Sequence, residues 1–155
     1  MKKSTLLLVV GAVAVVGAVA VIGNLLSTPS GSALQADPEN ESQVAVGKVV
    51  YEENCASCHG VGLEGERNWR RPKPDGGLRA PPHDETGHTW HHPDDLLFQL
   101  TKEGGKAYNP RSGMPGFGDT LTDDQIWSVL AYIKSRWPDS IQERQRDLTI
   151  ANRGQ

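Results

Sequence analysis

Two cysteines and a histidine within five residues constrain this chain more than any other feature of its sequence. Residues 55–59 read Cys-Ala-Ser-Cys-His, and Cys55 and Cys58 are the only cysteines among 155 residues. With two residues between them, one helical turn lets the two sulfurs reach the two vinyl groups of one porphyrin. The next residue, His59, can then direct its imidazole at the iron. The spacing therefore predicts one covalently attached haem c, with His59 as an axial ligand.

Two other kinds of site could use this pair of thiols. A zinc ribbon needs further ligands, and histidines are the only candidates left. Their spacing fits no zinc-finger pattern; they are His83, His88, His91 and His92. A thioredoxin-like redox pair requires a βαβ context, which the sequence does not offer. Haem attachment is the interpretation that the motif favours.

A methionine in a glycine- and proline-rich segment is the candidate for the second axial ligand. Met114 lies in the stretch Ser-Gly-Met-Pro-Gly-Phe, and the only other methionine is Met1. A lone methionine usually fills a core, but this one is not on a helix face. Gly113 and Pro115 would fix the backbone so that the thioether points inward. Ligation by methionine and histidine raises the reduction potential. A histidine of the later cluster is the alternative ligand.

The run from Gly87 to Asp95 concentrates histidines around one tryptophan. His88, His91 and His92 could bind a second metal such as copper or zinc, and the sequence leaves this open. The simpler interpretation places Trp90 in the haem pocket with its indole N–H on a propionate, and His92 at a helix N-cap.

A basic cluster precedes this run in the sequence. We interpret it as a solvated loop, and docking to an acidic partner protein is the alternative. The cluster comprises Arg67, Arg70, Arg71, Lys73 and Arg79.

The first 26 residues form an apolar segment. Lys2 and Lys3 precede an uncharged run over residues 4–26. As a helix it is long enough to cross a bilayer core, and it exceeds the apolar centre of most signal peptides. We expect residues 1–26 to be an uncleaved transmembrane anchor and residues 27–42 a flexible linker. The lysines then stay in the cytoplasm, and the haem domain is periplasmic on a bacterial inner membrane. Cleavage to a soluble periplasmic protein is the alternative.

Residues 43–138 show helical periodicity without strand alternation. Helices are expected over residues 43–54, from Pro93 to the Gly104-Gly105 pair, and from Thr122 to Trp137. The last has apolar residues at helical spacing, namely Ile126, Val129, Leu130, Ile133 and Trp137. Residues 139–155 are expected to be a polar tail. A weaker helix over residues 140–148 would begin with a capping box of Ser140 and Glu143.

The arrangement of residues 43–137 resembles the class I cytochrome c family. Gly47 and Tyr51 match its N-terminal helix, and the segment around Trp127, Leu130 and Tyr132 resembles the C-terminal helix that crosses it. The resemblance implies an all-α, cytochrome c-like domain around one covalent haem, preceded here by one transmembrane helix. It also implies that the Pro81 carbonyl accepts the N–H of His59 and orients it. Phe117 would cover the haem edge.

The expected function follows from an iron with two protein ligands. Such an iron has no open position for a substrate, so we expect a one-electron carrier and not an enzyme. Its partners would be redox proteins of a membrane respiratory chain, with a terminal oxidase as the acceptor. The net charge of −3 gives no reason to expect a nucleic-acid partner. The alternatives are a docked subunit, an assembly or metal-linked accessory protein, and a haem enzyme or gas sensor with a labile sixth ligand.

Overall fold

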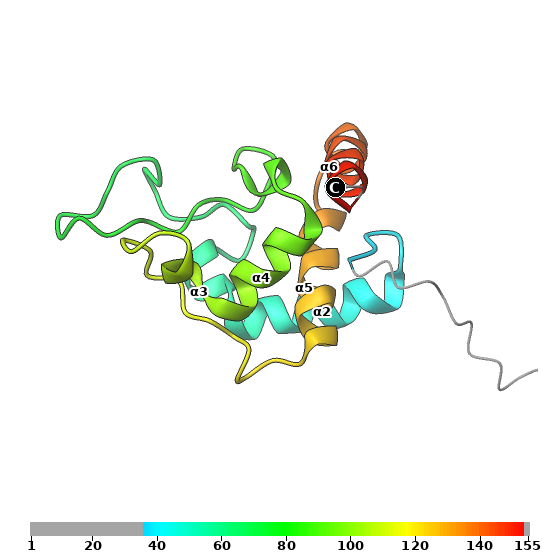
Figure 1. Cartoon of the computed structure of the whole chain (residues 1–155), viewed down its shortest axis with the longest axis horizontal. Coiled ribbons are helices and arrows are strands. Elements are labelled where there is room, and N and C mark those ends of the chain that lie inside the picture. Colours follow the sequence, from blue (N-terminus) through cyan, green and yellow to red (C-terminus); the bar gives the residue numbers. More distant parts are fainter. Residues whose placement is uncertain (1–35, 154–155) are drawn as a thin grey trace, which may run out of the picture. The chain divides into compact units, whose positions relative to one another are not determined.

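A computed structural model of the chain describes residues 36–153, and within this range it contains helices and loops only (Figure 1). The elements are α2 (Glu41–Asn54), α3 (Ala56–His59), η1 (Thr89–His91), α4 (Asp94–Glu103), η2 (Gly105–Ala107), α5 (Asp123–Ser135) and α6 (Asp139–Arg153). The predicted all-helical architecture is therefore confirmed for these residues. The predicted anchor over residues 1–26 lies outside the described residues, among which no helix is long and apolar enough to span a membrane.

Helix α2 begins slightly earlier than its sequence pattern indicates. The side chain of Asn40 caps the helix by accepting the Gln43 backbone N–H at 3.1 Å. The helix therefore begins at Glu41, within the segment predicted as linker. Its buried face carries Gly47, Val50 and Tyr51, which pack on α5.

Helices α2 and α5 approach closely because Gly47 has no side chain. A Cβ added there would lie 1.9 Å from the Ser128 carbonyl oxygen. Helix α5 begins with the predicted Thr122 cap, and a full capping box with Gln125 satisfies both backbone N–H groups. All five apolar residues predicted for its inner face are buried. The crossing of α2 and α5 is the centre of the fold.

Helix α4 begins one residue later than predicted. Pro93 is extended and occupies the N-cap, so it is not the first helical residue, and His92 is not the cap. Asp94 and Asp95 follow in the first turn, where acidic side chains are favoured. The helix ends at Gly104, whose φ of 88° suits a residue without Cβ.

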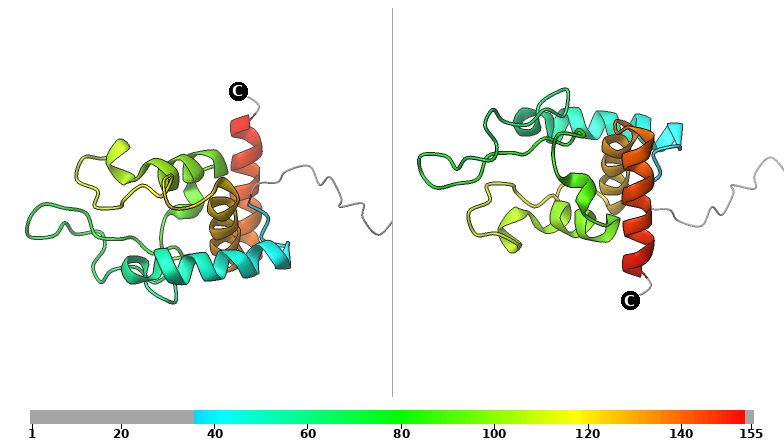
Figure 2. Two further views of the ribbon diagram at one scale, coloured as in Figure 1. Left: turned by 90° about the horizontal axis from the view of Figure 1, so that it is seen from below. Right: turned by 90° about the horizontal axis from the view of Figure 1, so that it is seen from above.

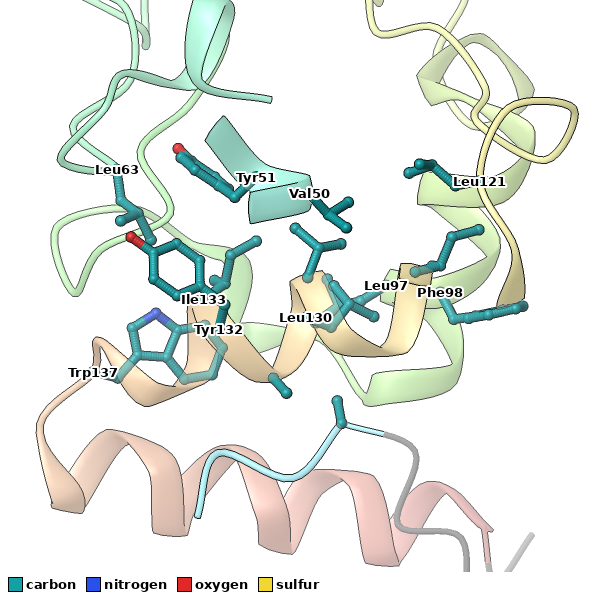
Figure 3. Packing of buried hydrophobic residues seen from close by; sticks show 14 residues of the cluster. Val50, Tyr51, Leu63, Leu97, Phe98, Leu121, Leu130, Tyr132, Ile133 and Trp137 are labelled. Carbon is teal, nitrogen blue, oxygen red and sulfur yellow. The ribbon is translucent and has the colours of Figure 1, made fainter. Parts of the chain in front are cut away.

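The hydrophobic core lies between α2, α4 and α5 (Figure 3). Aromatic pairs reinforce it: Tyr51 and Tyr132 lie 5.4 Å apart, and Phe98 stacks on Trp127 at 4.1 Å between ring centroids. Its fully or nearly fully buried members are Ala36, Val50, Tyr51, Leu63, Leu97, Phe98, Leu121, Ile126, Val129, Leu130, Ala131, Tyr132, Ile133 and Trp137.

The C-terminal segment forms a longer helix than predicted. Helix α6 begins at Asp139, so Ser140 lies inside its first turn and the predicted capping box at Ser140 is wrong. The helix continues to Arg153 because its inner side chains are buried although they are polar: Gln145 is 0% exposed and Thr149 6%. Both contact Asp94, at the start of α4. Figure 2 shows α6 beside α5, on the opposite side of the domain from the long loops.

Candidate haem site

The Cys55–His59 motif lies at the C-terminal end of α2. Cys55 follows the last residue of this helix, and residues 56–59 form the single turn of α3. Cys55 is half-buried and Cys58 exposed, and both are free thiols. Burial raises the pKa of the Cys55 thiol to about 11. The hydroxyl of Tyr51 donates to the Gly60 carbonyl at 2.8 Å and fixes the end of the turn against α2. The motif is thus rigidly attached to the core helix.

His59 is held in the tautomer that a metal ligand requires. Its Nδ1 lies 2.9 Å from the Pro81 carbonyl oxygen. A carbonyl only accepts, so Nδ1 carries the proton and Nε2 keeps its lone pair. Burial lowers the pKa of His59, against a smaller opposing effect of the Pro81 hydrogen bond, and the ring is 7% exposed. The structure therefore places His59 and Pro81 together in the arrangement that orients an imidazole towards iron.

His83 lies directly beside His59, which sequence reasoning did not anticipate. The two rings stack with centroids 4.0 Å apart and 21° between their planes. The His83 Nδ1 lies 2.8 Å from the Thr89 hydroxyl. His83 faces the flat side of the His59 ring and not its Nε2, so in this arrangement the two imidazoles would not hold one metal ion together.

Met114 lies on a separate loop that backbone contacts hold at the end of α4. Its carbonyl accepts the Gly105 N–H at 3.1 Å, and its own N–H donates to the Ser112 hydroxyl at 3.2 Å. Gly104 and Gly116 bring the two ends of the loop together, because a Cβ on Gly104 would lie 2.5 Å from the Gly116 nitrogen. The Met114 side chain is half-buried. The loop is thus fixed independently of α2 and α3.

Trp90 and the neighbouring histidines lie against α6 and the loop over residues 60–80. The indole N–H of Trp90 donates to the Glu85 carbonyl at 3.3 Å, and the Arg144 guanidinium lies 5.1 Å from its ring centroid. His88 stacks on Trp69, and its ring also lies edge-on to that of His92, with 5.6 Å between the ring centroids. Within residues 36–153, no three side chains of His, Cys, Asp or Glu come together in a group that could hold a metal ion. The structure gives no support to a second metal site in this run.

The residues present fit a haem. Two thiols lie one turn apart, a neutral imidazole has a free Nε2, and a thioether lies on a second loop. One further observation concerns the propionates. The Nε of Arg79 is buried and has no hydrogen-bond partner among the described residues. It offers a cationic donor to a carboxylate, two residues before Pro81.

Comparison with known proteins agrees with this chemistry. The fold and the attachment motif define a bacterial monohaem c-type cytochrome. The family described as "Cytochrome C oxidase, cbb3-type, subunit III" matches residues 42–133, more than half of the chain, and the chain belongs to this family. Membership of this family implies one covalently bound haem c.

One curated relative extends the comparison. The chain is 29% identical over 105 residues to the "Cbb3-type cytochrome c oxidase subunit FixP" of Sinorhizobium medicae (strain WSM419). The alignment covers 64% of this chain and 32% of the relative, so the chain spans about a third of that protein's length. No solved structure matches the chain.

Proposed function

We propose that this protein is a one-electron carrier that passes electrons to a terminal oxidase of a membrane respiratory chain. Cys55 and Cys58 would hold the porphyrin, while His59 and Met114 would ligate the iron. When bound, the haem supplies an Fe(III)/Fe(II) couple. With both protein ligands in place the iron would have no open position for a substrate, and this favours electron transfer over catalysis.

The observation that carries the proposal is the hydrogen bond between His59 Nδ1 and the Pro81 carbonyl. It fixes the imidazole plane and leaves Nε2 as the donor atom. The loop of Met114 is held by its own contacts with the end of α4. Two ligands on separately fixed segments need little rearrangement when the iron changes its charge, and this supports rapid electron transfer.

The membrane arrangement is also a proposal. Residues 1–26 would anchor the chain in a bacterial inner membrane, and the following residues, up to Ala36 in the core, would tether the haem domain in the periplasm. The uncharged run over residues 4–26 and the lysines that precede it support this topology. The name of the FixP relative supports an oxidase as the partner.

Carbon monoxide binding tests the ligand set of the haem-loaded protein. The wild-type reduced protein is expected to be low-spin, to bind carbon monoxide only slowly, and to titrate reversibly with one electron. Met114→Ala opens the sixth position, so rapid carbon monoxide binding and a lower reduction potential are expected. Rapid binding by the wild type would instead favour a gas sensor or enzyme. Isolation only as a stoichiometric part of an oxidase would favour a docked subunit.

A further inference from the structure

The two long loops of the domain are basic, although the chain as a whole is acidic. Residues 60–80 contain five basic and three acidic residues, and residues 105–118 contain two basic residues and no acidic one. Each loop therefore has a net charge of +2 in a chain whose net charge is −3. The positive charge is concentrated in these loops, while the remainder of the chain is strongly negative.

Most of this positive charge is available to a partner. Lys73 and Arg79 pair with Glu66 at 3.3 and 3.8 Å, so one carboxylate neutralises part of their charge. The other arginines are exposed and take part in no ion pair among the described residues; they are Arg67, Arg70, Arg71 and Arg111. We call these four residues the arginine patch.

An ordered tryptophan lies within the arginine patch. Trp69 stacks on His88 with the rings 11° apart, and the Arg70 guanidinium lies 4.4 Å from its ring centroid. Asn68, Trp69, Arg70 and Arg71 line an open surface hollow of about 360 Å³. Tryptophan and arginine are the residues most enriched at the energetic centres of protein interfaces. A fixed indole beside exposed guanidinium groups is therefore suited to contact another protein.

The arginine patch lies at the end of the domain that carries the proposed iron ligands. The loop over residues 60–80 begins directly after His59 and ends before Pro81, and the second loop contains Met114. The two loops are joined, because the Leu78 N–H donates to the Arg111 carbonyl at 3.0 Å. Figures 1 and 2 show both loops at one end of the domain and α6 at the other.

We propose that the arginine patch is the docking surface for a redox partner protein, and that it binds an acidic surface of that partner. The proposal rests on the electron-carrier function described above. Docking through this face brings the partner to the loop that follows His59 and to the loop that contains Met114, where electrons would leave or enter. The net negative charge of the rest of the chain turns this face towards an acidic partner during encounter.

Exposed arginines could also bind an anionic membrane surface, but the position of Trp69 favours a protein partner. Trp69 is half-buried and covered by His88 and Arg70, so its indole is not free to insert into a lipid headgroup layer. A membrane contact at this end would also cover the face through which electrons are exchanged.

Stopped-flow reduction of the full-length haem-loaded protein by reduced flavodoxin, an acidic electron donor, tests the proposal. The test variant is Arg70→Gln/Arg71→Gln. The matched control is Arg144→Gln/Arg146→Gln, which makes the same change in net charge at exposed positions of α6. Reduction by dithionite, which needs no docked protein, reports whether each variant still accepts an electron.

The wild type and the α6 variant are expected to react with flavodoxin about tenfold faster at low than at high salt, because salt screens the attraction that accelerates the encounter of the two proteins. The test variant should react about tenfold more slowly than wild type at low salt, and its rate should be nearly independent of salt.

Equal flavodoxin rates in the two variants, with normal dithionite reduction, would overturn the docking surface and leave the carrier function intact. Loss of dithionite reduction in the wild type would overturn the carrier function. Arginine-dependent sedimentation with phosphatidylglycerol vesicles, at unchanged flavodoxin rates, would assign the patch to the membrane.

Discussion

At the scale of single residues, Glu66 holds the loop between His59 and Pro81 in place. Its carboxylate accepts the Ala80 N–H at 2.6 Å and lies 3.3 Å from the Lys73 ammonium. These contacts hold the pKa of Glu66 below its ordinary value of 4.5, chiefly through the Ala80 hydrogen bond and then through Lys73 and Arg79. One acidic residue therefore stabilises the backbone that carries the Pro81 carbonyl.

The pH dependence of stability tests this role of Glu66. Because its pKa is lowered by folding, its stabilising effect is fully present above about pH 4.5 and is lost as the pH falls through the lower folded-state pKa. Glu66→Gln should therefore lower the free energy of unfolding by about 1 kcal/mol near pH 7. The difference from wild type should vanish in acid. Denaturant unfolding at a series of pH values measures it, and a difference that persists unchanged in acid would contradict the account.

At the scale of helices, the crossing of α2 and α5 depends on one missing side chain. The space at Gly47 is occupied by the carbonyl of Ser128 and the Cβ of Tyr132. Backbone atoms cannot move aside as a flexible side chain can. Any residue larger than glycine must therefore separate the two helices and disturb the core between them.

Gly47→Ala is expected to destabilise the folded protein by about 3 kcal/mol, the upper range for overpacking. Val49→Ala is the matched control, since Val49 lies on the same helix and is 52% exposed. Thermal unfolding followed by circular dichroism measures both. Equal midpoints for the two variants would show that the helices do not cross as closely as the structure indicates.

The helices show which parts of the structure can be predicted from sequence. Helix α5 is predictable because its buried residues are apolar and repeat at helical spacing. Helix α6 was expected to be shorter because its buried residues, Gln145 and Thr149, are polar and are normally exposed. At the candidate site, the Cys55–His59 motif is contiguous in sequence. The positions of His83 and Glu66 depend on the path of the loop over residues 60–80, which no periodicity encodes.

At the scale of the whole molecule, a buried ion pair joins three helices. The Lys134 ammonium of α5 lies 2.9 Å from both carboxylate oxygens of Asp94 on α4, and both side chains are 7% exposed. Gln145 of α6 donates to the same carboxylate at 2.7 Å. Helix α6 lies beyond residues 42–133, which match the family. This contact therefore attaches an additional helix to the domain that the family model describes.

Removing one partner of the buried ion pair is expected to lower the free energy of unfolding more than removing both charges does. Lys134→Met leaves the Asp94 carboxylate buried without its cation, and a loss of about 3–5 kcal/mol is expected. Lys134→Met/Asp94→Asn should recover much of this loss. Denaturant unfolding of the haem-loaded variants measures both values. A single variant within about 1 kcal/mol of wild type would contradict the buried pair.

The ligation of the iron by His59 and Met114 is the central claim, and proton NMR of the reduced protein tests it most directly. A methionine bound to low-spin ferrous haem lies in the ring current of the porphyrin. One three-proton methyl resonance, shifted far upfield of all others, is therefore expected in the wild type and should be absent in Met114→Ala. A wild-type spectrum without that resonance, or a resonance that persists in Met114→Ala, would contradict the claim.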